Sequence, residues 1–331
     1  MQTPATDATI PTGIAAPMDP QIAEFMRRMA ADAAQHPRRD TVGIAQGRQI
    51  AEKVRAPWAQ GGPVMESTRE RFVPTRHGDV RLRIHTPRQR ELPGAFVYIH
   101  GGGFVVFSLD THDRVMREYA ERAGIVVIGI DYTRAPEGAF PRPLEECVDV
   151  VTWLADGGAA ALGIDPGQIF IGGDSAGGNL SVGTCYSLKL AGRNGLVKGM
   201  VLNYGAYDTS PYSASVARYG AGEYGLSVHM MIWFYVLYLG EGGPNYTDPR
   251  MHLISADVSG LPPAYMVITE CDPLYDTNVA MHKHLLAAGV DVEAVVYEGT
   301  IHSFLEAVSI ADVAGRAFDD TVRWLQRQCT R

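Results

Sequence analysis

The sequence predicts an α/β fold in which a mostly parallel, doubly wound sheet carries helices on both faces. Two observations indicate this class: short runs are almost wholly apolar, and helical patterns separate most of them. A strand that is apolar on both sides needs a helical layer on each face, as in a parallel sheet. The apolar runs cover residues 95–100, 125–132, 169–173, 199–205, 264–270 and 292–299.

The elements between and before these runs complete the expected body. The helical patterns cover residues 110–123, 143–155, 179–191, 275–288 and 309–328. Ahead of the first apolar run, "RERFVP" and "VRLRIHTP" alternate apolar and charged residues, which is typical of half-buried antiparallel strands. His77, Gly78 and Asp79 are expected to form the turn between them. We therefore expect two antiparallel strands at the N-terminal edge of the sheet.

Two further segments are expected to form a cap. Ile22, Phe25, Met26 and Met29 recur at helical spacing near the N-terminus, and a long Tyr- and Gly-rich insertion follows the fourth apolar run. Ligands of open α/β sheets bind at the carboxyl ends of the strands, so we expect both segments to cover that edge. The predicted division is residues 1–57 for the N-terminal cap helices, 66–206 and 260–331 for the body, and 207–259 for the cap insertion.

Composition excludes several classes of function. The chain has 331 residues, 46% of them hydrophobic, and a formal net charge of -8, so nucleic acid is not an expected partner. The most apolar run, "MMIWFYVLYLG" at 230–240, is too short to cross a bilayer, and the first residues lack the pattern of a secretory signal. The four cysteines lie far apart without a C-x-x-C pair, which favours a cytoplasmic protein without structural zinc.

A glycine-rich turn, "IFIGGDSAGGNLSVG" at 169–183, has three possible interpretations. A phosphate loop needs a lysine after its last glycine, and a dinucleotide fingerprint needs glycine where Ser175 stands, so neither fits. Close packing of strand and helix remains open. The third interpretation is a nucleophile elbow, because Gly173 to Gly177 form G-x-S-x-G directly between a buried strand and a helix. That placement favours Ser175 as a nucleophile.

A serine nucleophile needs a histidine base and a carboxylate that orients it. In this class of sheet the partners follow in the order Ser, Asp or Glu, His, each just beyond a later strand. Asp272 follows the run at 264–270, and His302 follows the run at 292–299. Asp276 is a rival carboxylate, but it stands at the start of the next helix, where capping is the simpler role.

The other histidines have simpler interpretations. His282 and His284 fall within a helical pattern, and His100 precedes the serine at the end of an earlier strand. Polar, solvated surroundings are expected for His36, His77 and His112. The stretch "HGGGF" at 100–104 also follows a buried strand, and its glycines allow main-chain N–H groups to turn towards a ligand. With the N–H of Ala176, these groups are candidates for an oxyanion hole.

These motifs resemble those of the hormone-sensitive-lipase-like family of α/β-hydrolases, and most closely its bacterial acetyl-esterase-type carboxylesterases. The motifs are "HGGG" (100–103), "DYTRAPE" (131–137), "GDSAGG" (173–178), "DPLYD" (272–276) and "GTIHSF" (299–304). The resemblance implies the α/β-hydrolase fold, the triad Ser175, Asp272 and His302, and an oxyanion hole of Gly102, Gly103 and Ala176. It also implies a cap, and no metal or organic cofactor is required.

The expected function is that of a serine carboxylesterase which hydrolyses short-chain acyl esters through an acyl-enzyme intermediate. Its partner is a small-molecule ester, and a homodimer is possible. An acyltransferase on the same triad and a non-catalytic binding homologue remain alternatives. The residues proposed to line the pocket, each of which could equally be ordinary core, are Phe104, Tyr204, Tyr207, Trp233, Phe234, Ile301 and Phe304.

Overall fold

The computed structural model describes residues 17–330, which form a twisted sheet of eight strands with helices around it. Each apolar run of the sequence lies within or overlaps one strand of the sheet. The strands are β1 (Ser67–Thr75), β2 (Gly78–Thr86), β3 (Ala95–Ile99), β4 (Val126–Asp131), β5 (Ile169–Asp174), β6 (Gly199–Asn203), β7 (Ala264–Cys271) and β8 (Val292–Ile301).

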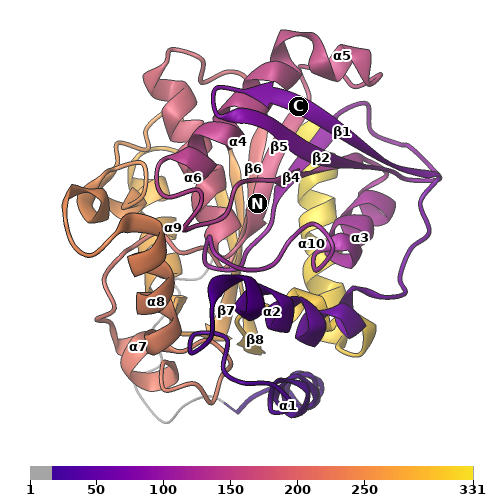
Figure 1. The fold of residues 1–331 in the computed structure, drawn as a ribbon. Coiled ribbons are helices and arrows are strands. Elements are labelled where there is room, and N and C mark those ends of the chain that lie inside the picture. The colour runs from indigo at the N-terminus through magenta and orange to yellow at the C-terminus, as the bar shows by residue number, and fades with distance from the viewer. Residues whose placement is uncertain (1–16, 331) are drawn as a thin grey trace, which may run out of the picture.

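The strand order is β1-β2-β4-β3-β5-β6-β7-β8. Strands β3 to β8 pair in parallel, whereas β2 pairs antiparallel with both β1 and β4. The predicted mostly parallel sheet with an antiparallel N-terminal edge is therefore confirmed. The figure shows this hairpin reaching out from one side of the sheet (Figure 1).

The helices occupy the positions between strands that the sequence patterns predict, with short additions. The α-helices are α1 (Pro20–Ala33), α2 (Ile44–Ala59), α3 (Asp113–Ala123), α4 (Arg142–Trp153), α5 (Ala159–Ala161), α6 (Ala176–Leu190), α7 (Ala214–Tyr219), α8 (Val228–Leu239), α9 (Tyr275–Ala287) and α10 (Asp312–Cys329). Shorter 3-10 or π turns are η1 (Leu154–Gly158), η2 (Pro244–Thr247), η3 (Leu253–Ser255) and η4 (Phe304–Ser309).

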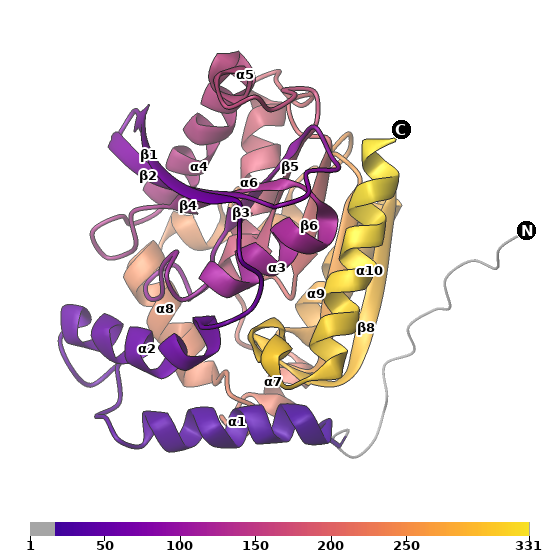
Figure 2. The same cartoon turned by 90° about the vertical axis from the view of Figure 1, so that its right-hand side faces the viewer.

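Helices cover both faces of the sheet. One buried cluster joins α3 and α10 to their face of the sheet, and another joins α4, α6 and α9 to the opposite face (Figure 2). Strands β3 to β6 are buried on both faces, which explains why their sequences are apolar without alternation. This double covering holds the sheet rigid beneath the loops at its carboxyl edge.

The N-terminal helices lie beyond that edge. Both views place α1 and α2 together there, with α7 and α8 beside them (Figures 1 and 2). At the start of α1, the Asp19 N–H donates to the carbonyl of Gly299, 3.0 Å away. Within α2, Arg48 donates to the carbonyls of Val105 and Ala135, each at 2.8 Å. These contacts attach the N-terminal helices to loops that follow the strands.

Three helices begin three residues away from the predicted start, and the first of them, α3, begins at Asp113 rather than Asp110. Helix α6 begins at Ala176 rather than Asn179, because the glycines after Ser175 adopt helical geometry as soon as the turn ends. The last helix begins at Asp312 rather than Ser309, because η4 occupies Phe304–Ser309. Glycine and the short η4 turn obscure where regular helix starts when only periodicity is used.

Candidate active site

Ser175 occupies a sharp turn between β5 and α6. Its backbone has φ 55° and ψ -117°, which is a strained conformation for a residue with a side chain. A Cβ on either Gly173 or Gly177 would overlap the carbonyl oxygen of Ile99 on the neighbouring strand β3. Only glycine therefore fits on either side of the serine, and the turn presents the Ser175 side chain at the carboxyl edge of the sheet.

Three side chains from separate loops meet at this turn. Ser175 Oγ lies 2.8 Å from His302 Nε2, and His302 Nδ1 lies 2.7 Å from Asp272 Oδ2. Because the Asp272 carboxylate accepts the Nδ1 proton, His302 Nε2 is the ring nitrogen free to accept from the hydroxyl. The structure thus brings together the three residues that the sequence analysis grouped.

Asp272 is fixed by groups other than the histidine. Its carboxylate accepts from the Thr269 hydroxyl at 2.6 Å and from the Leu274 N–H at 2.8 Å, and the residue is 0% exposed. The rival Asp276 does not cap its own helix. Its carboxylate accepts from the Ser215 N–H at 2.8 Å and so ties α9 to α7, away from His302.

The glycine loop after β3 adopts conformations that favour glycine, with φ 106° at Gly102 and 58° at Gly103. A Cβ on Gly102 would overlap the Val106 carbonyl, and a Cβ on Gly103 would overlap the ring of Phe234. Within residues 17–330, the N–H groups of Gly102, Gly103 and Ala176 have no main-chain acceptor, and all three residues line the same cavity as Ser175. These N–H groups are free to bind a ligand oxygen.

A buried charged pair supports the loop from behind. Asp174 accepts from the Tyr98 hydroxyl at 2.7 Å and from the Gly101 N–H at 3.0 Å, and it lies 3.3 Å from His112 Nε2. Burial would raise the pKa of Asp174, but the charge and hydrogen bond of His112 outweigh burial and hold that pKa at about 2. Burial likewise opposes protonation of His112, yet Asp174 raises the His112 pKa above its usual value.

The expectation of a solvated His112 is wrong, because this residue is 1% exposed. Sequence reasoning also overlooked Asp174 and Tyr98. The available signal was an acidic residue at the end of a wholly apolar strand, since a buried carboxylate requires a partner. The partner of Asp174 is His112, which lies just before α3 and about 60 residues earlier in the chain. No local sequence pattern connects the two residues.

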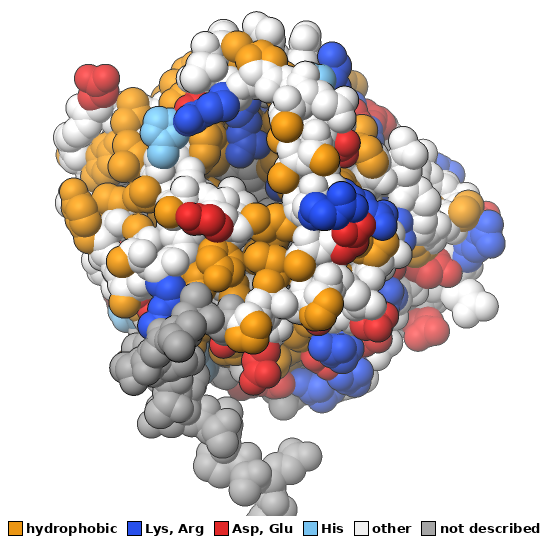
Figure 3. Space-filling view, turned by 90° about the horizontal axis from the view of Figure 1, so that it is seen from below, with side chains coloured by type: hydrophobic (Ala, Val, Ile, Leu, Met, Phe, Trp, Pro, Cys, Tyr) orange, Lys and Arg blue, Asp and Glu red, His pale blue; other side chains and the backbone are white. Residues whose placement is uncertain are grey.

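A cavity of about 840 Å³ opens above these residues. Figure 3 shows a hollow on the face seen from below, with hydrophobic side chains around it and Lys or Arg side chains on its wall. Of the aromatic and apolar residues predicted to line the pocket, Phe104, Phe234 and Ile301 do so. The remaining predicted residues, Tyr204, Tyr207, Trp233 and Phe304, do not line it.

Each of these four has a structural reason to lie elsewhere. Tyr204 is buried beneath the site, with its ring edge against His302 at a centroid distance of 5.1 Å. Tyr207 and Phe304 are fully buried in the two cores on either side of the sheet. Trp233 of α8 packs against the buried core, whereas the next residue, Phe234, faces the cavity.

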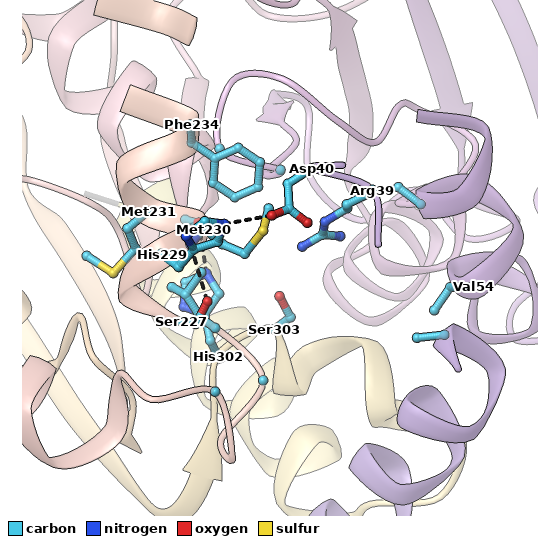
Figure 4. A pocket seen from close by; sticks show the side chains of 18 of the residues that line it. Arg39, Asp40, Val54, Ser227, His229, Met230, Met231, Phe234, His302 and Ser303 are labelled. Atoms are coloured by element: carbon cyan, nitrogen blue, oxygen red, sulfur yellow. Dashed lines mark hydrogen bonds and ion pairs between the residues drawn. The ribbon is translucent and has the colours of Figure 1, made fainter. Parts of the chain in front are cut away.

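The wall opposite the triad comes from α8 and from the link between α1 and α2. In Figure 4, His229 of α8 reaches Asp40 of that link, and the two side chains are 2.6 Å apart. Arg39 projects into the same space, and Arg55 of α2 lines the cavity while pairing with buried Glu306 at 2.6 Å. Sequence reasoning gave no role to these charged residues, because nothing local distinguishes them from solvated surface residues.

Comparison with known proteins decides the family. A family described as "alpha/beta hydrolase fold" matches residues 96–306. The chain belongs to this α/β-hydrolase family. The hydrolase is 38% identical over 252 residues to an ethyl acetate hydrolase of Pseudomonas putida, covering 74% of this chain and 78% of that protein. It is 34% identical over 269 residues to an acetyl esterase of Salmonella enteritidis, covering 81% and 82%.

Solved structures agree with this assignment. A hyperthermophilic esterase from Pyrobaculum calidifontis superposes on the hydrolase with a TM-score of 0.87 and 33% identity, covering 95% of this chain and all of that one. The predicted resemblance to hormone-sensitive-lipase-like bacterial carboxylesterases is confirmed. The hydrolase is a carboxylic ester hydrolase.

Across residues 17–330, no helix is both long and apolar enough to cross a membrane. In the same part of the chain, no three His, Cys, Asp or Glu side chains are grouped so as to hold a metal ion.

Proposed function

We propose that Ser175 is the nucleophile of a serine carboxylesterase, with His302 as its base and Asp272 as the group that orients the base. The observation that carries this proposal is the unbroken chain Ser175 Oγ, His302 Nε2 and Nδ1, and Asp272 Oδ2, with contacts of 2.8 and 2.7 Å at the floor of a cavity. A serine, a neutral imidazole and a buried carboxylate in this order generate an alkoxide equivalent at neutral pH.

The reaction proceeds in two halves. Ser175 Oγ attacks the ester carbonyl while His302 takes its proton, and the N–H groups of Gly102, Gly103 and Ala176 stabilise the oxyanion. His302 then protonates the leaving alcohol, and an acyl-enzyme remains. A water molecule, deprotonated by His302, attacks that acyl group and releases the acid. Asp272 stays ionised throughout and stabilises the imidazolium.

We propose short-chain acyl esters as the substrates. The relatives that support this assignment are named for ethyl acetate and for acetyl esters. Phe234 also supports it, because its ring lies against Gly103. The ring leaves little room beside residues 100–104, termed the oxyanion loop. A chain-length series of p-nitrophenyl esters tests the assignment, and a rate that rises steadily towards long acyl chains would contradict it.

Residues 17–57 and 207–259 are proposed to act together as the cap, and residues 1–16 of the predicted cap lie outside the described residues. The support is that residues from α1, α2 and α8 form the outer wall of the cavity, while the body supplies Ser175 and His302. A cytoplasmic location is also proposed. It is supported by Cys147 and Cys185, which are buried and form no disulfide.

The test uses wild type and Ser175→Ala, which removes only the attacking oxygen. Wild type is expected to hydrolyse p-nitrophenyl acetate and to be labelled by a fluorophosphonate, and Ser175→Ala is expected to lose both properties. Ser181→Ala is a matched control, because its buried hydroxyl bonds only the Gly177 carbonyl of its own helix. Wild type that binds esters without labelling or turnover would contradict the proposed function.

A further inference from the structure

The cavity that contains Ser175 holds a positive charge that forms no direct ion pair with any carboxylate of residues 17–330. Its lining includes Arg38, Arg39 and Arg55, and Asp40 is the only Asp or Glu among the lining residues that the structure describes. This arrangement is unexpected in a chain whose net charge is -8. The arginines differ in their partners, and that difference identifies the one that is available to a ligand.

Two of the arginines are already paired. Arg55 donates to buried Glu306 at 2.6 Å. Arg38 donates to Asp40 at 2.8 Å, and the same carboxylate also contacts His229 at 2.6 Å. The carboxylates near the cavity are therefore committed to other groups.

Arg39 is the exception. Across residues 17–330, no side-chain or main-chain acceptor lies within hydrogen-bond distance of its guanidinium. Figure 4 shows it pointing into the space between α8 and the loop that carries His302 and Ser303. Burial, followed by repulsion from Arg55, lowers the pKa of Arg39 to about 10, with Asp40 opposing in part, so the group remains a cation at neutral pH. Its N–H donors face the cavity without a partner.

Arg39 also lies near the glycine loop that follows β3. Its guanidinium carbon lies 5.8 Å from the ring centre of Phe234 and 5.9 Å from that of Phe107. Phe234 lies against Gly103, and Phe107 lies against Gly102. The guanidinium is therefore one aromatic ring away from the oxyanion loop. The main chain of Arg39 packs directly on Gly47 of α2, where a Cβ would intrude, and this contact fixes its position.

We propose that Arg39 binds a carboxylate carried by the substrate, so that the enzyme prefers esters of small molecules that also bear a free carboxyl group. A guanidinium fork matches a carboxylate in geometry, and such a contact is strong where water is excluded. The inference rests on the proposed function, because it names the class of ester that the Ser175 site takes. Arg39 acts here as a specificity-determining residue, whereas Ser175 performs the chemistry.

The experiment compares substrates that differ only in charge. One pair carries the group on the alcohol side, 4-acetoxybenzoate and 4-acetoxybenzamide, and the other carries it on the acyl side, monoethyl glutarate and its primary amide. The measured quantity is the ratio of kcat/KM for the carboxylate over the amide. In wild type this ratio is expected to exceed one in at least one pair, by roughly 10- to 100-fold.

Arg39→Gln is expected to remove most of that preference by raising KM for the carboxylate substrate. Arg39→Lys is expected to keep part of the preference. Arg28→Gln is the matched control. It removes one positive charge from neighbouring α1, where Arg28 pairs with exposed Glu24 outside the cavity lining, and the ratio should stay as in wild type. A ratio that Arg39→Gln leaves within twofold of wild type in both pairs would overturn the proposal.

A separate measurement distinguishes this proposal from the proposed function. If wild type hydrolyses p-nitrophenyl acetate but shows no preference for either carboxylate, the esterase assignment stands and the role of Arg39 is refuted. Calorimetric binding to Ser175→Ala needs no turnover, and the probe is the acid of the pair that shows the preference, 4-hydroxybenzoate for the alcohol side or glutarate for the acyl side. Binding that is lost in the Ser175→Ala, Arg39→Gln double variant supports the Arg39 site, and equal binding by both variants contradicts it.

Discussion

In this site, individual side chains are held in one conformation by the groups that surround them. Asp272 illustrates this principle, since Thr269 and the Leu274 N–H bind the carboxylate oxygens and direct one of them at His302 Nδ1. The imidazole is thereby held in one tautomer, with Nε2 facing Ser175. We expect the serine to require this oriented hydrogen bond and not the negative charge alone.

Asp272→Asn tests that statement. The amide has nearly the same shape, but its NH₂ group favours the wrong tautomer of His302, so kcat for p-nitrophenyl acetate is expected to fall on the order of 10⁴-fold. Asp276→Asn is the matched control, because its amide oxygen can still accept from the Ser215 N–H, and it should change kcat less than twofold. Equal losses in both variants would mean that Asp272 is not the orienting residue.

At the scale of elements, the loop after β3 contacts a different kind of neighbour at Gly102 and at Gly103. Gly102 faces the main chain at Val106, whereas Gly103 faces the side chain of Phe234 on α8. Added bulk at Gly102 therefore has to move the backbone. Bulk at Gly103 has only to move an aromatic ring of the proposed cap. The same loop thus meets the body at one residue and α8 at the next.

This difference predicts the outcome of a double-mutant cycle. Gly102→Ala and Gly103→Ala are each expected to lower kcat by about 10²–10³-fold by displacing an oxyanion donor. When Phe234→Ala is added to Gly103→Ala, kcat should rise at least tenfold, with Phe234→Ala alone as the reference. When Phe234→Ala is added to Gly102→Ala, kcat should not rise. Rescue of both or of neither would contradict the assigned neighbours.

The strands and the loops that follow them show how much of the fold and of the site the sequence could predict. Apolar runs located all six parallel strands, and in β3 to β6 burial on both faces explains why the runs show no alternation. Ser175, Asp272 and His302 were predicted because each follows a strand directly, so their convergence depends only on the order of the sheet. Tyr204, Tyr207 and Phe304 were misplaced because an aromatic residue near a strand end points to either the cavity or the core, and only packing decides which.

At the scale of the whole molecule, charge is distributed unevenly. The chain is acidic overall, yet its cavity is lined with arginines, and an ion pair of His112 with Asp174 is buried behind the oxyanion loop. The buried pair links α3 to the end of β5 and so joins two parts of the body. Its contribution to stability depends on pH, since both partners must be ionised.

The sign follows from the two pKa shifts. The pKa of Asp174 falls from 3.8 to about 2 on folding, so its contribution is complete above pH 3.8 and is lost as the pH falls towards 2. The pKa of His112 rises above 6.5, so its contribution is complete below pH 6.5 and is lost at higher pH. The pair therefore stabilises the fold most between about pH 4 and 6.5.

Thermal unfolding of wild type and His112→Gln checks this window. The difference in Tm between them is expected to be largest near pH 5 and smaller at pH 3 and pH 9. Ser181→Ala is the control, because the Ser181 hydroxyl carries no charge and donates to the Gly177 carbonyl of its own helix, and its difference from wild type should not vary with pH. A His112→Gln difference that stays constant from pH 3 to pH 9 would contradict the ion pair.

We expect the unpaired guanidinium of Arg39 to affect the end of each catalytic cycle as well. Ester hydrolysis creates a carboxylic acid, and a cation beside the oxyanion loop retains that newly formed anion as readily as it attracts an incoming one. The acidic exterior acts in the opposite direction and draws no anion back once it has left. Because dissolved salt screens this outer field over about 8 Å at physiological strength, ionic strength becomes a control on how quickly product escapes.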